Sequence, residues 1–211
     1  MELFTEFVNK TLCVITVKQY SEDDYSKMKK TGVLLFPLFS EYELTVALSI
    51  LKQGNKPITT IGITAEPIFG ESDLKCLSDY TIYDVDIETL DSILIPGCMD
   101  ITTLFDNDDL IEFIRRCVEF NSEVIIGSIS SSPYLLAKAG ILENRKYTIG
   151  MHEAGRSQTG VFNEENYCDD LVVQDGGILT ARGRAFIEFG IRFGQLLNLD
   201  FDSSWYKGNH K

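Results

Sequence analysis

Residues 123–140, EVIIGSISSSPYLLAKAG, decide the fold of this chain. The run Val124–Ile126 is short and apolar, which is typical of a strand buried on both faces of a parallel sheet. Pro133 suits the first position of a helix, where its missing N–H is not needed, and the apolar residues after it recur at helical spacing. The stretch therefore predicts a buried strand, a sharp turn and a helix.

The serine-rich turn between this strand and this helix has two interpretations. In a nucleophile elbow, a strained residue stands at the strand–helix junction with small residues two before it and two after it. That pattern places Ser130 at the apex, between Ser128 and Ser132. An ordinary polar loop with a serine cap for the helix explains the same residues. The backbone angles of Ser130 distinguish the two, because only the elbow requires strain there.

Composition and charge limit the class of protein. The chain has 211 residues, of which 44% are hydrophobic and 24% charged, as expected for one globular domain with a full core. Its 19 basic and 32 acidic residues give a formal charge of −13. Nucleic acids and anionic membrane surfaces bind clustered Lys and Arg, so neither is expected as a partner. Without a long apolar run or the basic start of a signal peptide, the sequence predicts a cytoplasmic protein.

The cysteines and histidines predict no metal site and no other cofactor. The five cysteines are widely scattered, without a CxxC pair: Cys13, Cys76, Cys98, Cys117 and Cys168. Their odd number and spacing argue against a disulfide framework and indicate a reducing compartment. Two histidines without a ligand cluster argue against a zinc site.

Apolar runs alternate with amphipathic stretches along the rest of the chain. Strands are predicted at Gly32–Phe36, Thr59–Thr64, Ser92–Ile95, Val124–Ile126 and Arg145–Ile149. Helices are predicted at Glu41–Gln53, from Asp106 to about Phe120, after Pro133 and at Gly183–Leu197. Hairpin turns are predicted at Gly70–Ser72 and Asp175–Gly176. This order predicts an α/β fold: a doubly wound, flavodoxin-like three-layer sandwich with a mostly parallel sheet and small antiparallel hairpin insertions.

Three strand ends are candidates for a binding site. In open parallel sheets, ligands bind at the carboxyl ends of the strands. The segments that follow such ends here are Pro37–Glu43, Pro96–Asp100 and Ser128–Pro133. We expect these three segments to converge.

The same three segments resemble motifs of the ThiJ/PfpI superfamily, which is related to the class I glutamine amidotransferases. LFPLFSEYEL at 35–44 looks like the first strand, loop and helix start of that family, and IPGC at 95–98 is similar to its PGG turn. SSSP at 130–133 falls on its cysteine-containing elbow. AKAGILENRKYT at 137–148 and LVVQDGGILTARG at 171–183 extend the likeness.

The resemblance also implies a domain organisation. It covers residues 30 to 197, so that residues 30–211 form a ThiJ/PfpI-like domain and residues 1–29 an N-terminal extension. Members of the family commonly pair, which implies a homodimer. A small-molecule ligand or substrate is the expected partner of the site.

Catalytic roles follow from the resemblance residue by residue. Glu43 falls on the active-site glutamate of the family, and Ser130 on its nucleophilic cysteine. A cysteine at a helix N-terminus ionises near neutral pH, whereas a serine stays protonated and needs a general base. The candidate base is His152, oriented by Glu153 or another carboxylate; an exposed loop histidine is the alternative. For Glu43 the alternative is an ordinary acidic residue in the first turn of a helix.

The turn at Gly97 supplies the remaining candidates. The backbone N–H groups of Cys98 and Ser131 could stabilise an oxyanion in a pocket beside Gly97. The thiol of Cys98, placed next to this pocket, could instead act as a redox sensor, although thiols at such turns are commonly buried and inert.

Two functions remain open at this point. The first is a stress-related ThiJ/PfpI-like protein that keeps the family pocket without the cysteine nucleophile and acts in ligand binding or as a chaperone. The second is a serine-dependent hydrolase of a small carbonyl or acyl compound with Ser130 as nucleophile. A glutamine amidotransferase is less favoured, since the required cysteine is missing and no synthetase domain is present.

Overall fold

The computed structural model describes residues 28–207, and the predicted N-terminal extension therefore lies almost wholly outside the described residues, as does Cys13. A seven-stranded sheet forms the centre, in the order β5–β2–β1–β6–β7–β9–β8. Its strands are β1 (Lys30–Leu35), β2 (Ile58–Gly62), β5 (Tyr80–Thr81), β6 (Leu90–Ile95), β7 (Ile125–Ile129), β8 (Val172–Asp175) and β9 (Ile178–Ala181). Every neighbouring pair is parallel except β8–β9.

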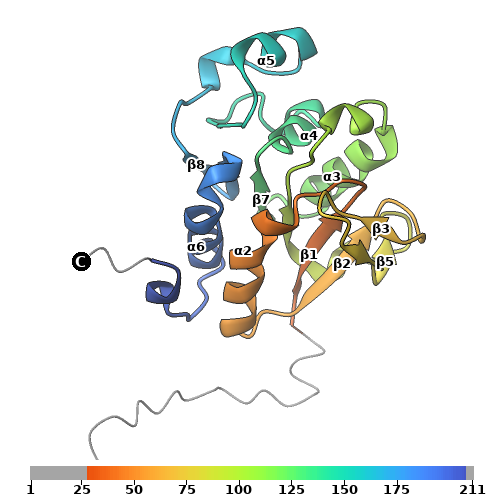
Figure 1. Ribbon diagram of the computed structural model, residues 1–211, viewed down its shortest axis with the longest axis vertical. Helices are drawn as coiled ribbons and strands as arrows, with labels where there is room; N and C mark the ends of the chain where they lie inside the picture. Colours follow the sequence, from red (N-terminus) through yellow and green to blue (C-terminus); the bar gives the residue numbers. More distant parts are fainter. Residues whose placement is uncertain (1–27, 208–211) are drawn as a thin grey trace, which may run out of the picture.

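Helices cover both faces of this sheet (Figure 1). The α-helices of the described residues are α2 (Glu41–Gln53), α3 (Asp108–Phe120), α4 (Pro133–Lys138), α5 (Glu153–Thr159) and α6 (Phe186–Leu196), of which α5 lies beyond the sheet at the top of Figure 1. Helices α2 and α6 pack against each other on one side, and α3 contacts α4 on the other. The predicted α/β three-layer sandwich with a mostly parallel sheet is confirmed.

Burial explains why the central strands are continuous apolar runs. Side chains on both faces of β1, β6 and β7 are buried, so alternation of polar and apolar residues is not needed. Phe189 and Phe193 of α6 are fully buried and lie next to Gly127 of β7, so these aromatic side chains belong to the core.

Both predicted hairpins are present. Strands β3 (Ile68–Phe69) and β4 (Lys75–Cys76) pair antiparallel, as predicted around Gly70–Ser72. The β8–β9 hairpin closes at the pair Asp175 and Ile178, so its two-residue loop lies one position later than predicted. Gly176 has φ +59°, a left-handed conformation that favours glycine in such a turn.

The predicted strand Arg145–Ile149 is wrong. The segment makes one isolated bridge, between Tyr147 and Tyr167, and the Thr148 N–H donates to the Thr180 hydroxyl at 2.9 Å. Strand β9, which carries Thr180, is already paired with β7 and β8. The segment therefore cannot pair with β9, although its sequence is apolar enough for a strand.

Residues 28–207 contain neither a membrane-spanning helix nor a cluster of metal ligands. No helix in this range is long and apolar enough to cross a membrane. In the same range, no three His, Cys, Asp or Glu side chains gather closely enough to hold a metal ion.

Candidate functional site

The predicted elbow is confirmed by the backbone of Ser130. This residue follows β7 directly, precedes α4, and has φ +66°, a left-handed conformation that costs a non-glycine residue energy. Its N–H donates to the Ala181 carbonyl at 2.8 Å, and its carbonyl accepts from the Gly150 N–H at 2.7 Å. These two hydrogen bonds hold the strained backbone of Ser130 in place.

The other elbow serines have structural roles. Ser128 and Ser132 are fully buried, and their hydroxyl oxygens lie 2.8 Å apart. The Ser132 hydroxyl also lies within hydrogen-bonding distance of the Ile95 carbonyl, at 3.1 Å, which ties the elbow to the end of β6. These contacts leave Ser130 as the elbow serine that borders the pocket described below.

The three strand ends converge as predicted. The Ser40 N–H, before α2, donates to the Gly97 carbonyl at 2.9 Å. The Cys98 N–H donates to Ser131 Oγ at 3.0 Å, which joins the turn after β6 to the elbow. The ends of β1, β6 and β7 are therefore linked directly by hydrogen bonds.

Glu43 is the buried carboxyl group at the centre of this junction. It is 0% exposed, and it accepts hydrogen bonds from the Gly97 N–H (2.7 Å to Oε2) and from Tyr42 Oη (3.0 Å to Oε1). Burial raises the pKa of Glu43, while the hydrogen bonds from Gly97 and Tyr42 act in the opposite direction. The Ser130 hydroxyl lies close to this carboxyl group, because a Cβ on Gly183 would be 3.1 Å from Ser130 Oγ and 2.4 Å from Glu43 Oε1.

Two glycines make room for this carboxyl group. A Cβ on Gly97 would lie 2.4 Å from Glu43 Oε2 and 2.5 Å from Ser130 Cβ. A Cβ on Gly183 would lie 2.4 Å from Glu43 Oε1. Sequence reasoning missed Gly183 and Tyr42; the available signals were the ARG end of the 171–183 motif and the position of Tyr42 next to Glu43.

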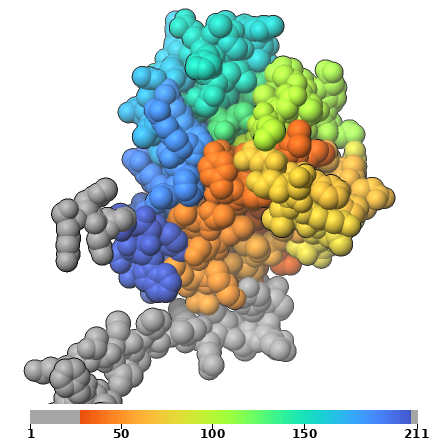
Figure 2. Space-filling model, viewed as in Figure 1, coloured from red at the N-terminus to blue at the C-terminus, as the bar shows by residue number. Residues whose placement is uncertain are grey.

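A pocket of about 590 Å³ opens beside Ser130. It is lined by Tyr42, Ser130, residues 149–153, Arg156, Tyr167, Asp169 and residues 182–184. Figure 2 shows that orange surface from the α2 region and blue surface from the C-terminal third adjoin on one face, although they are far apart in the chain. The predicted pocket residues Gly97, Cys98 and Ser131 do not line this pocket, and neither does Glu43. Tyr42 and Ser130 lie between the pocket and the buried carboxyl group.

His152 and Glu153 lie on the rim of the pocket. Both are exposed, His152 just before α5 and Glu153 at its first position. Both border the same pocket as Ser130, but within residues 28–207 the imidazole of His152 makes no hydrogen bond to Ser130 or to Glu153. The structure brings the predicted base near the serine without joining the two.

The candidate oxyanion donors differ in availability. The Gly97 N–H is engaged by Glu43, and the Cys98 N–H by Ser131 Oγ. Across the described range, the Ser131 N–H has no acceptor. The Cys98 thiol lies 3.5 Å from the Pro37 carbonyl, and burial raises its pKa, which opposes the thiolate form.

The pocket wall is rich in guanidinium groups although the chain is acidic. Arg156 pairs with Glu164 at 2.8 Å and stacks on Tyr167, 3.6 Å from the ring centroid. Arg182 pairs with Asp169. Arg184 is exposed and makes no ion pair with any residue in the described range. A carboxylate group is therefore a chemically suitable part of a ligand here.

Comparison with known proteins shows the family. Residues 29–194 match the DJ-1/PfpI family, and the chain belongs to it. Protein DJ-1alpha of Drosophila melanogaster is 28% identical over 160 residues, covering 74% of this chain and 70% of that protein. The glutathione-independent glyoxalase DJR-1.2 of Caenorhabditis elegans is 28% identical over 162 residues, covering 74% of this chain and 81% of that protein.

Solved structures show the same fold. A thiJ/pfpI family protein from Bacillus anthracis matches with a TM-score of 0.76 and 22% identity, over 87% of this chain and 92% of that one. A two-domain protein from Anabaena variabilis, with DJ-1/ThiJ/PfpI-like and ferritin-like domains, matches with a TM-score of 0.71 and 19% identity. This chain covers 52% of that second protein.

Proposed function

We propose that this chain is a stress-related DJ-1/PfpI protein that binds a small carbonyl or acyl compound in the pocket beside Ser130. In this proposal a serine stands where the family motif has a nucleophilic cysteine, and the protein acts as a cytoplasmic homodimer. The observation that carries the proposal is the proximity of Ser130 to the buried Glu43 at the edge of a 590 Å³ pocket: a Cβ on Gly97 would lie 2.9 Å from Ser130 Oγ and 2.4 Å from Glu43 Oε2. That volume lies within the usual range for small-molecule sites.

The hydrogen-bond partners favour binding over acyl transfer. A serine nucleophile needs a general base, and within residues 28–207 no hydrogen bond joins Ser130 to the candidate base His152. An oxyanion needs preorganised donors, yet the N–H groups of Gly97 and Cys98 already have acceptors. The pocket retains binding groups with little catalytic machinery.

Binding is tested with pyruvate, which carries a carbonyl and a carboxylate. In ¹H–¹⁵N spectra of the whole chain, we expect pyruvate to shift the amide signals of pocket residues such as Gly150 and Arg184. Amides of Glu112 and Arg115, on the exposed face of α3, should stay in place. Shifts spread evenly over the molecule would contradict a site at this pocket.

The serine-hydrolase alternative is favoured by one observation: His152 lines the same pocket as Ser130, and the N–H of the next residue, Ser131, has no acceptor among residues 28–207. A fluorophosphonate probe followed by intact-mass analysis separates the proposals. We expect no adduct on wild type. An adduct that disappears in Ser130→Ala would establish the hydrolase instead.

The glyoxalase named among the relatives calls for a direct assay on this chain. We expect glyoxal to be consumed no faster by wild type than by Ser130→Ala, since the elbow carries a hydroxyl group in place of a thiol. If wild type consumed glyoxal and Ser130→Ala did not, the function would be catalysis and not ligand binding.

Chaperone-like activity remains part of the proposal because of apolar side chains near β3–β5. Leu74 is 55% and Leu77 69% exposed, which gives an unfolded chain an apolar surface to contact. We expect Leu77→Glu to reduce suppression of client aggregation relative to wild type. If wild type and Leu77→Glu suppressed client aggregation equally, the exposed side chains of Leu74 and Leu77 would have no part in chaperone-like activity.

A further inference from the structure

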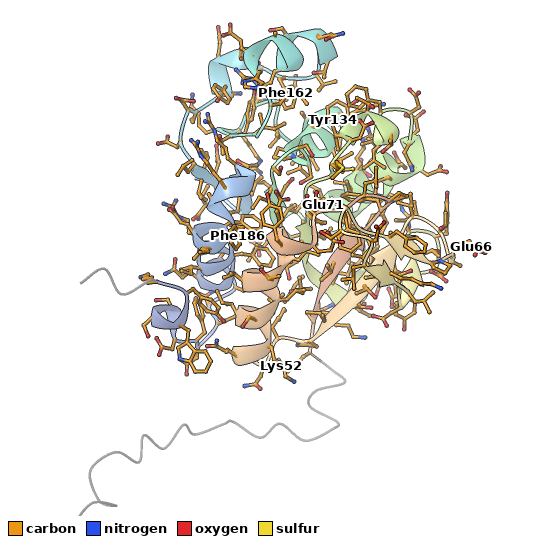
Figure 3. The ribbon with its side chains drawn as sticks, in the orientation of Figure 1. Lys52, Glu66, Glu71, Tyr134, Phe162 and Phe186 are labelled. Carbon is orange, nitrogen blue, oxygen red and sulfur yellow. The ribbon has the colours of Figure 1, made fainter. Side chains whose placement is uncertain are left out.

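Tyr42 lies between the pocket and the buried carboxyl group of Glu43, which does not line the pocket. Tyr42 lines the pocket and is 45% exposed, whereas Glu43 is fully buried. The Tyr42 hydroxyl donates to Glu43 Oε1 at 3.0 Å. Its ring packs edge-on against Phe186, with centroids 5.4 Å apart, and Figure 3 labels Phe186 at the start of α6 beside α2. The hydroxyl group is therefore held at the boundary between pocket and core.

Three side-chain oxygens meet at this boundary. Measured from the point where a Cβ on Gly183 would lie, Glu43 Oε1 is 2.4 Å away and the hydroxyl oxygens of Ser130 and Tyr42 are each 3.1 Å away. Both hydroxyl groups thus flank the same carboxyl group and also border the pocket. A ligand beside Ser130 is also beside Tyr42.

The hydroxyl group of a tyrosine has one proton to donate. Tyr42 can donate it to Glu43 or to an acceptor on a ligand. When a ligand accepts this hydrogen bond, the Glu43 carboxylate loses one of the donors that stabilise its charge. Burial then favours the neutral carboxyl group, whose own O–H can donate to Ser130 Oγ.

We propose that Tyr42 is a specificity-determining residue: its hydroxyl binds ligands with an exposed oxygen acceptor, and their binding brings one proton from solvent to Glu43. The inference rests on the proposed function, ligand binding in this pocket. The ligand class is narrowed to compounds with a carbonyl or carboxylate oxygen that can reach Tyr42. Because binding takes up a proton, affinity should fall as the pH rises through the titration of Glu43.

Other charged groups around Glu43 fit this scheme. Glu71, in the β3–β4 turn, raises the pKa of Glu43 in the same direction as burial, and the Ser40 hydroxyl holds Glu71 at 2.6 Å. On the side of Gly183, the guanidinium groups of Arg182 and Arg184 border the pocket. The elbow contributes the uncharged Ser130.

The test is calorimetric titration with pyruvate in buffers of different ionisation enthalpy, at pH values spanning the titration of Glu43. For wild type, the observed heat should depend on the buffer, which reports proton uptake. Tyr42→Phe should bind about tenfold more weakly, with a heat independent of the buffer. Glu43→Gln, which keeps Tyr42, should retain binding but lose the buffer dependence.

Tyr83→Phe is the matched control. Tyr83 also donates to a carboxylate, Asp109, at 2.7 Å, but it does not line the pocket. We expect this variant to bind pyruvate like wild type, with the same proton uptake.

The outcomes separate the two proposals. Wild-type affinity and proton uptake in Tyr42→Phe would overturn the role of Tyr42 and leave ligand binding intact. Proton uptake that persists in Glu43→Gln would likewise overturn the inference, even if Tyr42→Phe does not fold. If pyruvate does not bind wild type, the proposed function fails for this ligand class, and the inference fails with it.

Discussion

Two tyrosine–carboxylate pairs in this molecule have the same chemistry in opposite surroundings. Tyr42 donates to Glu43 at 3.0 Å, and Tyr83 donates to Asp109 at 2.7 Å. Glu43 is fully buried, whereas Asp109 is exposed and Tyr83 is 68% exposed. The Tyr83–Asp109 hydrogen bond is the shorter of the two, but water can replace it because both residues are exposed. The donor–acceptor distance therefore does not show which hydrogen bond contributes more to stability. Loss of a donor matters most where the acceptor is desolvated.

The pKa values of the two tyrosines differ in cause. Burial, followed by the charge of Glu43, raises the pKa of Tyr42 to about 12. The pKa of Tyr83 is also raised, chiefly by its hydrogen bond to Asp109. The pKa of Tyr42 is thus raised mainly by desolvation, and the pKa of Tyr83 mainly by one hydrogen bond.

The largest expected effect comes from filling the space around the buried pair. Gly97→Ala should lower the free energy of unfolding by about 3 kcal/mol, because the new Cβ meets Glu43 Oε2 and Ser130 Cβ. Gly140→Ala is the control: Gly140 has φ +80° and open space around it, so only backbone strain of about 1 kcal/mol is expected. Urea denaturation measures both, and equal losses would show that crowding at Glu43 costs nothing.

The second largest expected effect is on the pH dependence of stability, which should differ between Glu43 and Asp109. Because the pKa of Glu43 is raised on folding, the native state binds more protons than the unfolded state between the ordinary value of 4.5 and the folded value. The contribution of Glu43 to stability should therefore fall by about 1.4 kcal/mol per pH unit in this window, as the pH rises.

Glu43→Gln should remove that fall, and Asp109→Asn should not. The comparison uses urea denaturation of wild type and both variants at several pH values. Parallel curves for wild type and Glu43→Gln would contradict a raised pKa at Glu43.

The smallest expected effect is the loss of one hydroxyl group. Tyr42→Phe should destabilise the protein by about 1 kcal/mol, because the fully buried Glu43 loses a hydrogen-bond donor at Oε1. Tyr83→Phe should leave stability unchanged, since water can hydrogen-bond to Asp109 in its place. Thermal unfolding at one pH measures both variants; an equal loss in both would show that burial does not distinguish the pairs.

Much of the fold could be predicted from local patterns in the sequence. The amphipathic stretch Glu41–Gln53 has the bounds of α2, and the apolar runs at β1, β6 and β7 were identified from their length and flanking turns. The strain at Ser130 followed from the order of strand, small residues and proline. These features depend on neighbouring residues, which a sequence displays directly.

The remaining features depend on contacts distant in the chain. Whether Arg145–Ile149 joins a sheet depends on a free edge, and β9 offers none because β8 occupies it. The proximity of Gly183 to Glu43 and the engaged N–H of Cys98 likewise arise from segments far apart in sequence. No local pattern encodes which donor an acceptor takes in the folded chain.

Substitutions in the β3–β4 hairpin could change the properties of the pocket during evolution. The hairpin is fastened to the start of α2: the Ser40 hydroxyl donates to Glu71, and the Ser72 N–H donates to Glu41 at 2.9 Å. Glu43 lies two residues beyond Glu41 on the same helical turn. Substitutions in this outlying hairpin can therefore alter the electrostatic setting of the buried carboxyl while every ligand-contacting residue is inherited unchanged.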